Sequence, residues 1–184
     1  MANLPTLSVV ITCYREGDLL LEAIASVRQQ SIAPLDIVIV NDASPDDRTN
    51  QVCHQLEADP AVTLVWQARN GGPSVARNAG FAAAQGEILV PLDADDLLPP
   101  EALAHIQRAF GQYPEAGFIY GSYRCQRHPG DTQVVKAEPI SLNSLLRSRR
   151  FSPSSGSLWP TASHSDLRSG AVPIKVQLVL REKR

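Results

Sequence analysis

Short runs of apolar and β-branched residues alternate along this chain with segments of helical periodicity, and this alternation constrains the fold most strongly. Strands are expected at Leu7–Thr12, Asp36–Asn41, Val62–Trp66 and Ile88–Leu92, with a fifth at Phe118–Tyr123. Because helical segments separate the first four runs, the pattern predicts an α/β fold. Its sheet is expected to be mostly parallel, with helices on both faces.

The helices between these strands carry recognisable start and stop signals. Asp18 is expected to cap the first helix, and Ser44, followed by Pro45 and two acidic residues, is expected to cap the second. The two remaining helices are expected at Ser74–Gln85, with Gly86 as the C-terminal stop, and at Glu101–Phe110.

Polar residues follow three of the predicted strands at the point where each strand ends. Thr12 and Tyr14 follow the first strand, Asp42 follows the second, and Asp93 and Asp95 follow the fourth. Ligands of open parallel sheets bind beyond the carboxyl ends of the strands. The sequence therefore predicts a binding site built from these residues at one edge of the sheet.

The chain has 184 residues, of which 43% are apolar and 20% charged, as expected of one globular domain. We expect this domain to occupy residues 1–150. Residues 141–171 contain ten serines without a clear period, so 151–184 is expected to be an atypical, disordered tail. A last strand is expected within it at Ile174–Leu180.

Several features indicate a cytoplasmic protein. No apolar run approaches the roughly 18 residues of a membrane span, and the N-terminus shows no secretory signal. The cysteines Cys13, Cys53 and Cys125 are too few for a disulfide framework and are expected to be reduced thiols.

Charge is distributed unevenly along the chain. Residues 1–123 contain 6 Lys and Arg against 15 Asp and Glu, whereas residues 124–184 contain 11 against 4. The basic C-terminal third can face an anionic partner, such as the inner surface of a membrane or a lipid phosphate. The alternative is a solvated tail without a partner.

Asp93, Asp95 and Asp96 place three carboxylates within four positions at a predicted strand end. Like charges this close are costly unless a cation or strong donors neutralise them. Carboxylate oxygens suit Mg²⁺ or Mn²⁺, which bind largely through substrate phosphates. Alternation puts Asp93 and Asp95 on one side and leaves Asp96 to cap the next turn. The alternative is a polar loop with an Asp cap.

Three further residues are candidates, each with a plain structural alternative. The Asp42 carboxylate can accept from a base or a ribose hydroxyl, or it can be a turn residue. The Tyr14 ring can stack on a nucleobase, or it can be a half-buried aromatic residue of a loop. Arg77 can bind phosphate or carboxylate, or it can lie on the surface of an Ala-rich helix.

Other function classes lack their required motifs. No GxGxxG follows the first strand, and there is no GxxxxGK[ST] and no lysine before Lys136. No basic surface interleaved with aromatic residues indicates nucleic-acid binding.

Four blocks together look like glycosyltransferase family 2 in order, spacing and strand placement. They are residues 9–16 (VVITCYRE), 40–44 (VNDAS), 70–78 (NGGPSVARN) and 92–96 (LDADD). The resemblance covers roughly residues 5–150 and implies the GT-A fold. It implies an inverting, metal-dependent transfer of sugar from a nucleoside-diphosphate donor, most simply a UDP-sugar, to a saccharide or lipid-linked acceptor.

The resemblance also implies roles for individual residues. Thr12, Tyr14 and Glu16 would line the nucleoside pocket, and Asp42 would contact the base. Asn70 and Arg77 would lie near the nucleotide. Asp93 would lie near the ribose or donor sugar, and Asp95, together with Asp93, would hold the divalent cation.

No catalytic base is assigned, because the family's base normally comes from an acceptor half beyond the matched blocks. After residue 150 only Asp166 and Glu182 are acidic. The resemblance therefore implies a truncated member, or a chain whose last residues come from an altered reading frame. A nucleotide-binding remnant without turnover and a methyltransferase-like enzyme with Asp42 on an adenosine ribose remain the alternatives.

Overall fold

The main sheet of the computed structural model has four parallel strands in the order β3-β2-β1-β4. The structure describes residues 4–128, 131–136 and 182–183. The strands are β1 (Leu7–Cys13), β2 (Asp36–Asn41), β3 (Val62–Trp66) and β4 (Ile88–Asp93). β2 and β3 have the predicted bounds, and β1 and β4 each extend one residue further, so the predicted parallel sheet is confirmed.

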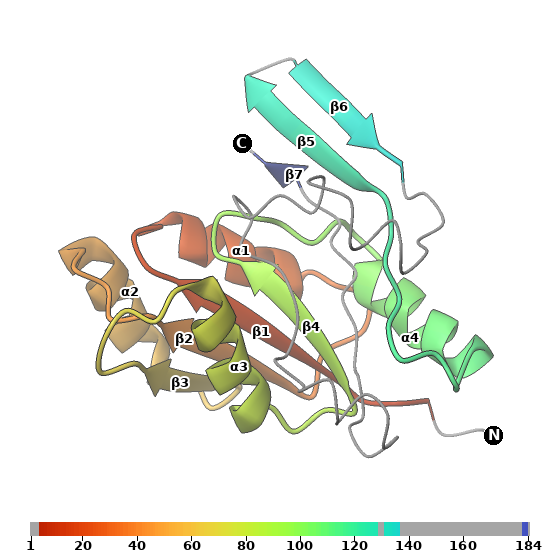
Figure 1. Ribbon diagram of the computed structural model, residues 1–184, viewed down its shortest axis with the longest axis horizontal. Helices are drawn as coiled ribbons and strands as arrows, with labels where there is room; N and C mark the ends of the chain where they lie inside the picture. Colours follow the sequence, from red (N-terminus) through yellow and green to blue (C-terminus); the bar gives the residue numbers. More distant parts are fainter. Residues whose placement is uncertain (1–3, 129–130, 137–181, 184) are drawn as a thin grey trace.

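Helices cover both faces of this sheet, as predicted (Figure 1). α1 (Leu19–Arg28), α2 (Asp47–Leu56) and α4 (Ala102–Gln112) contribute to the larger apolar cluster, and α3 (Pro73–Ala83) contributes to the smaller one. Burial on both faces explains why the strands are continuous apolar runs instead of alternating patterns.

Successive residues of β1 point to opposite faces, and this alternation decides where the site lies. Val9 and Ile11 belong to the larger cluster, whereas Val10 packs in the smaller cluster beneath α3. Two residues after Val10, Thr12 continues the row on the α3 side. Asp93 in β4 is aligned with Thr12.

A second sheet has the order β6-β5-β7 and contains β5 (Tyr123–His128), β6 (Asp131–Val135) and β7 (Glu182–Lys183). β5 pairs antiparallel with β6 and parallel with β7. The predicted strand Phe118–Tyr123 is wrong: residues 118–122 are outside any strand, because the pairing with β6 begins at Tyr123. The predicted strand at 174–180 and nearly all of the tail 151–184 lie outside the described residues.

Two of the predicted helix caps are wrong in their side-chain bonds. Asp18 occupies the N-cap position of α1 without a side-chain cap bond, because its carboxylate accepts from Arg48 instead. Asp46, not Ser44, caps α2, and its Oδ2 accepts from the Thr49 backbone N–H at 2.7 Å.

Gly86 does not end α3, which stops at Ala83 with Ala84 as C-cap. A Cβ at Gly86 would lie 2.5 Å from the backbone nitrogen of Ser8. Glycine is therefore required here for close approach of the chain to β1.

Candidate functional site

The carboxyl ends of the parallel strands form one row. Thr12 of β1 is aligned with Asp93 of β4, and Cys13 is aligned with Asn41 of β2. Beyond the strands, the Asp42 N–H donates to Cys13 O at 3.0 Å and the Ala94 N–H donates to Thr12 O at 3.2 Å. The predicted gathering of the strand-end residues at one edge is therefore confirmed.

Three carboxylates converge at the end of β4. One oxygen from each of Asp93, Asp95 and Asp96 lies within 4.8 Å of the others. Asp95 is exposed, Asp93 is half-buried and Asp96 is 2% exposed. Asp96 adds a third carboxylate to this cluster, and the N-cap position of α4 is Glu101. This set of hard oxygen donors fits a divalent cation.

Arg77 of α3 forms an ion pair with Asp93. Its Nη2 donates to Asp93 Oδ1, and the two side chains are 8% and 20% exposed. The alternative of a surface arginine is therefore wrong. The planar guanidinium reaches a carboxylate of the acidic cluster itself.

Asp42 fastens the turn that precedes α3. Its two carboxylate oxygens accept from the backbone N–H groups of Gly71 and Gly72, each at 2.8 Å. Asn70 Oδ1 also accepts from Gly72 at 3.1 Å, and Gly72 has a φ of +81°, which favours glycine. Asp42 is 4% exposed. It therefore positions the Asn70–Gly72 turn, a role that was not predicted.

The loop after β1 is held by hydrogen bonds within the loop and by one from Ser44. Glu16 Oε2 accepts from the Arg15 N–H at 2.8 Å and from the Tyr14 N–H, while Ser44 Oγ donates to the Tyr14 carbonyl. The Arg15 guanidinium lies over the half-buried Tyr14 ring, 5.2 Å from its centroid. The loop thus holds an aromatic ring with a cation on one face at the sheet edge.

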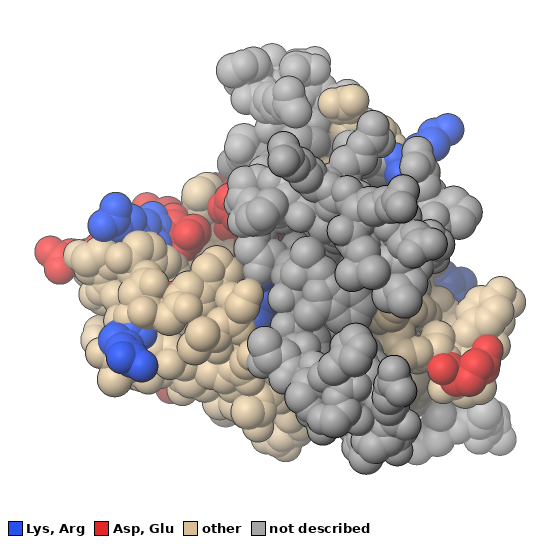
Figure 2. All heavy atoms as spheres, viewed as in Figure 1, with Lys and Arg blue, Asp and Glu red and all other residues tan. Residues whose placement is uncertain are grey.

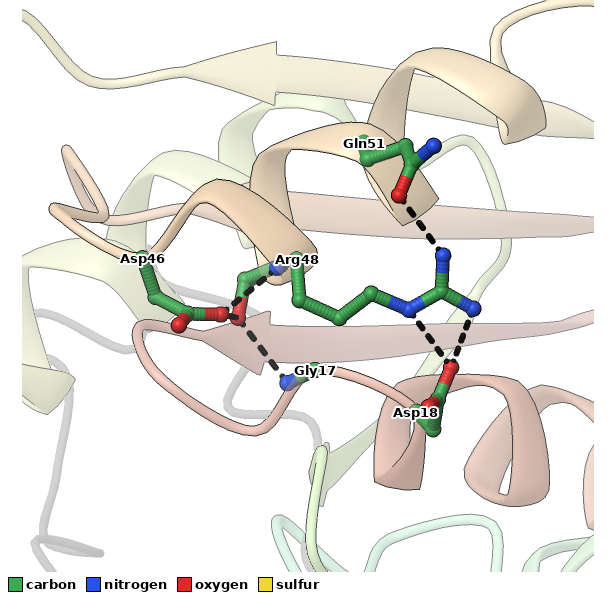
Figure 3. Close-up of polar contacts among 6 residues, drawn as sticks. Gly17, Asp18, Asp46, Arg48 and Gln51 are labelled. Carbon is green, nitrogen blue, oxygen red and sulfur yellow. Dashed lines mark hydrogen bonds and ion pairs between the residues drawn. The ribbon is translucent and has the colours of Figure 1, made fainter.

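The start of α2 supports the same loop (Figure 3). Thr49 Oγ1 accepts from the Gly17 N–H at 2.9 Å and donates to Asp46 Oδ2 at 2.7 Å. These hydrogen bonds from Thr49 hold the pKa of Asp46 below its ordinary value. Arg48 bridges from α2 to Asp18 at the start of α1, with Nε donating to Oδ1 at 2.9 Å.

Two free thiols lie beneath the edge. Cys13 Sγ is 3.7 Å from Cys53 Sγ, both residues are buried, and Asn41 Nδ2 donates to Cys53 Sγ at 3.6 Å. The hydrogen bond with Cys53, followed by burial, raises the pKa of Cys13 well above its ordinary value, so this thiol stays protonated. The side chain of Cys125 lies outside the described residues.

Charges of both signs are interspersed on the visible face near α2 and β3 (Figure 2). Most of the basic C-terminal third, and with it the predicted membrane contact, lies outside the described residues. Among the helices that the structure describes, none has the length and apolar character needed to cross a bilayer.

A family model described as glycosyl transferase family 2 matches residues 8–164. An uncharacterized glycosyltransferase of Nostoc sp. is 40% identical over 115 residues, which cover 62% of this chain and 35% of that protein. The succinoglycan biosynthesis protein ExoO of Rhizobium meliloti is 36% identical over 108 residues, 58% of this chain and 30% of that protein. The chain thus spans about a third of the length of these relatives.

Solved structures give the same fold. S. aureus TarS in complex with UDP-GlcNAc matches with a TM-score of 0.56 and 22% identity, over 70% of this chain and 37% of that one. The mannosyltransferase PcManGT from Pyrobaculum calidifontis, in complex with GDP-Man and Mn²⁺, matches with a TM-score of 0.54 and 29% identity, over 71% and 38% of the two chains. The predicted GT-A-type fold is thereby confirmed.

Proposed function

Because this chain belongs to glycosyl transferase family 2, we propose that it binds a nucleoside-diphosphate sugar at the carboxyl edge of the main sheet and transfers the sugar to an acceptor. The observation that carries this proposal is the convergence of Asp93, Asp95 and Asp96 at the end of β4. They lie at the same edge as Thr12, Asp42 and the Tyr14 loop. Such an edge is where open α/β sheets bind ligands.

The nucleoside would lie over the ends of β1 and β2. Tyr14 would stack on the base, and Thr12 and Glu16 would line the pocket beside it. Asp42 would contact the base, and the Asn70 turn that it holds would flank the nucleotide. We propose UDP as the nucleotide. The support is a likeness of fold to TarS, whose solved structure is a complex with UDP-GlcNAc.

The diphosphate would lie over the end of β4. Asp95, with Asp93, would hold Mg²⁺ or Mn²⁺, and Asp93 would also lie near the ribose or donor sugar. When bound, this cation would offset the charge that develops on the leaving diphosphate. The Mn²⁺ complex of PcManGT supports a divalent cation.

The transfer is proposed to invert the anomeric carbon, which requires a base for the acceptor hydroxyl. No described residue is assigned this role. Asp166 lies outside the described residues, and the side chain of Glu182 is not among those described. The acceptor is proposed to be a saccharide or lipid-linked saccharide of a surface polysaccharide, which similarity to the succinoglycan protein ExoO supports. The protein would act in the cytoplasm or at the inner face of the membrane.

The test is a calorimetric titration of UDP with and without Mn²⁺. We expect Mn²⁺ to tighten UDP binding at least tenfold in the wild type and to have little effect in Asp95→Ala, because the variant lacks the proposed metal ligand. The variant should still fold, because the exposed Asp95 side chain contributes little packing. Glu115→Ala, at an exposed acidic residue after α4, is the matched control and should behave as the wild type.

Three outcomes of this titration separate the candidate functions. Mn²⁺-dependent UDP binding together with hydrolysis of UDP-sugars supports the proposed enzyme. The same binding without hydrolysis indicates a nucleotide-binding module that lacks turnover. Binding of S-adenosylmethionine in place of UDP would refute the proposal.

A further inference from the structure

Among the arginines of residues 4–124, only Arg77 has a buried side chain. Burying a guanidinium is costly unless a partner compensates its charge. Asp93, which forms an ion pair with it, is one of the three carboxylates of the acidic cluster. The cluster and the arginine therefore have to be considered as one electrostatic unit.

The packing of α3 brings Arg77 to this position. Asp42 holds Gly71 and Gly72 in the turn immediately before the helix. Three residues after Arg77, Gly80 lies so close to the sheet that an added Cβ would be 2.3 Å from Val10 Cγ1. Residues three apart share a helix face, so the approach at Gly80 also brings Arg77 onto the sheet beside β4.

The charges of this unit bear on how tightly a cation binds when no nucleotide is present. Three carboxylates and one guanidinium leave a net charge of about −2 when all are ionised, and Asp93 Oδ1 is already an acceptor for Arg77. We propose that Arg77 is a positioning residue that acts through Asp93. Arg77 weakens cation binding when no nucleotide is bound, so that tight binding of the cation requires the phosphate oxygens of the nucleotide. This inference rests on the proposed function and adds an order of binding to it.

The inference makes opposite predictions for the two partners. Arg77→Met removes the compensating charge and should tighten Mn²⁺ binding in the absence of nucleotide by about tenfold. That is the effect of one unit charge on a divalent cation several ångströms away in a water-like medium. Asp93→Asn removes one carboxylate of the cluster and with it this ion pair, and it should weaken the same binding. The double variant restores the net charge but lacks the Asp93 carboxylate, so it should bind Mn²⁺ more tightly than Asp93→Asn and less tightly than Arg77→Met.

The experiment measures free Mn²⁺ by electron paramagnetic resonance, on the full 184-residue chain, first without and then with UDP. Arg69→Met is the matched control, because Arg69 is an exposed arginine just before the same turn, and it should not change Mn²⁺ affinity. General damage to the fold would weaken Mn²⁺ binding, whereas the proposal requires Arg77→Met to strengthen it. Thermal melting of each variant shows which of them fold.

If Arg77→Met binds Mn²⁺ no more tightly than the wild type, the inference is overturned. If Arg77→Met does not fold, the double variant decides: binding tighter than Asp93→Asn supports the inference, and equal binding overturns it. Failure of the proposed function has a different signature, since the wild type itself would then show no Mn²⁺-dependent gain in UDP affinity.

Discussion

Replacing Gly80 with alanine tests how tightly α3 is packed against the sheet that positions the site. Gly80 is buried, and a Cβ built on it would lie 2.3 Å from Val10 Cγ1 and 2.9 Å from Val40 Cγ2. Favourable carbon contacts are about 3.5–4.0 Å, so the helix or the valines must move by roughly 1 Å. Val10 and Val40 are both fully buried, which leaves them little freedom to move aside.

The expected cost follows from two opposing effects. Overpacking a core typically destabilises by about 1–3 kcal/mol, whereas replacing glycine with alanine inside a helix returns about 0.5–1 kcal/mol. We therefore expect Gly80→Ala to lower the free energy of unfolding by about 1–2 kcal/mol. For a chain of this size that corresponds to a fall in Tm of roughly 3–6 °C.

The assay is urea denaturation followed by circular dichroism, with Gly111→Ala as the matched control. Gly111 also lies in a helix, but its added Cβ would meet only Leu4 Cδ2, at 3.1 Å, and Leu4 is 47% exposed and can move. The control should therefore be neutral or gain up to about 1 kcal/mol. If Gly80→Ala is as stable as Gly111→Ala, the close packing of α3 described above is wrong.

Three other predictions concern the loops at the sheet edge. Tyr14→Ala should weaken UDP binding about threefold to tenfold, equally with and without Mn²⁺, because stacking on the base does not involve the cation; calorimetry in both conditions checks this, and an effect confined to Mn²⁺ would contradict it. Asp42→Asn should destabilise the fold by about 1–3 kcal/mol, because an amide NH₂ group would face a backbone N–H at Gly71 or Gly72. Faster hydrogen exchange at these two amides would locate the effect, and unchanged exchange would refute the prediction. The lowered pKa of Asp46 stabilises the fold at pH values above the ordinary pKa of the group, and this contribution is lost as the pH falls through the folded pKa. Asp46→Asn should therefore lose less stability than the wild type between about pH 5 and pH 2, and parallel curves of unfolding free energy against pH would contradict this prediction.

The strands could be predicted well because their signal is local. β2 and β3 are apolar runs bounded by polar or turn residues, and their bounds were predicted to the residue. The start of α2 was missed because Ser44 and Asp46 are both good caps. Only the three-dimensional structure shows that the Ser44 hydroxyl donates to Tyr14 O. The strand at Phe118–Tyr123 failed because strand pairing with β6 begins only at Tyr123.

The site could be predicted as a set of residues but not as a set of contacts. The strand ends reveal Thr12, Asp42 and Asp93, since polar residues after apolar runs are visible in the sequence. The bonds of Asp42 to Gly71 and Gly72 span 29 and 30 residues. The Arg77–Asp93 pair depends on how α3 lies on the sheet. Such contacts follow from tertiary packing, and only the Gly-Gly-Pro sequence gave a local sign of a special turn.

The central claim is that the carboxyl edge of the main sheet binds a nucleoside diphosphate together with a cation at the acidic cluster. Its most direct test is a crystal structure with UDP and Mn²⁺, with data collected for the anomalous signal of manganese. The account predicts a manganese peak within bonding distance of an Asp95 carboxylate oxygen and a uracil ring stacked on Tyr14. A manganese peak away from Asp93, Asp95 and Asp96, or a nucleotide bound at the amino ends of the strands, would contradict it.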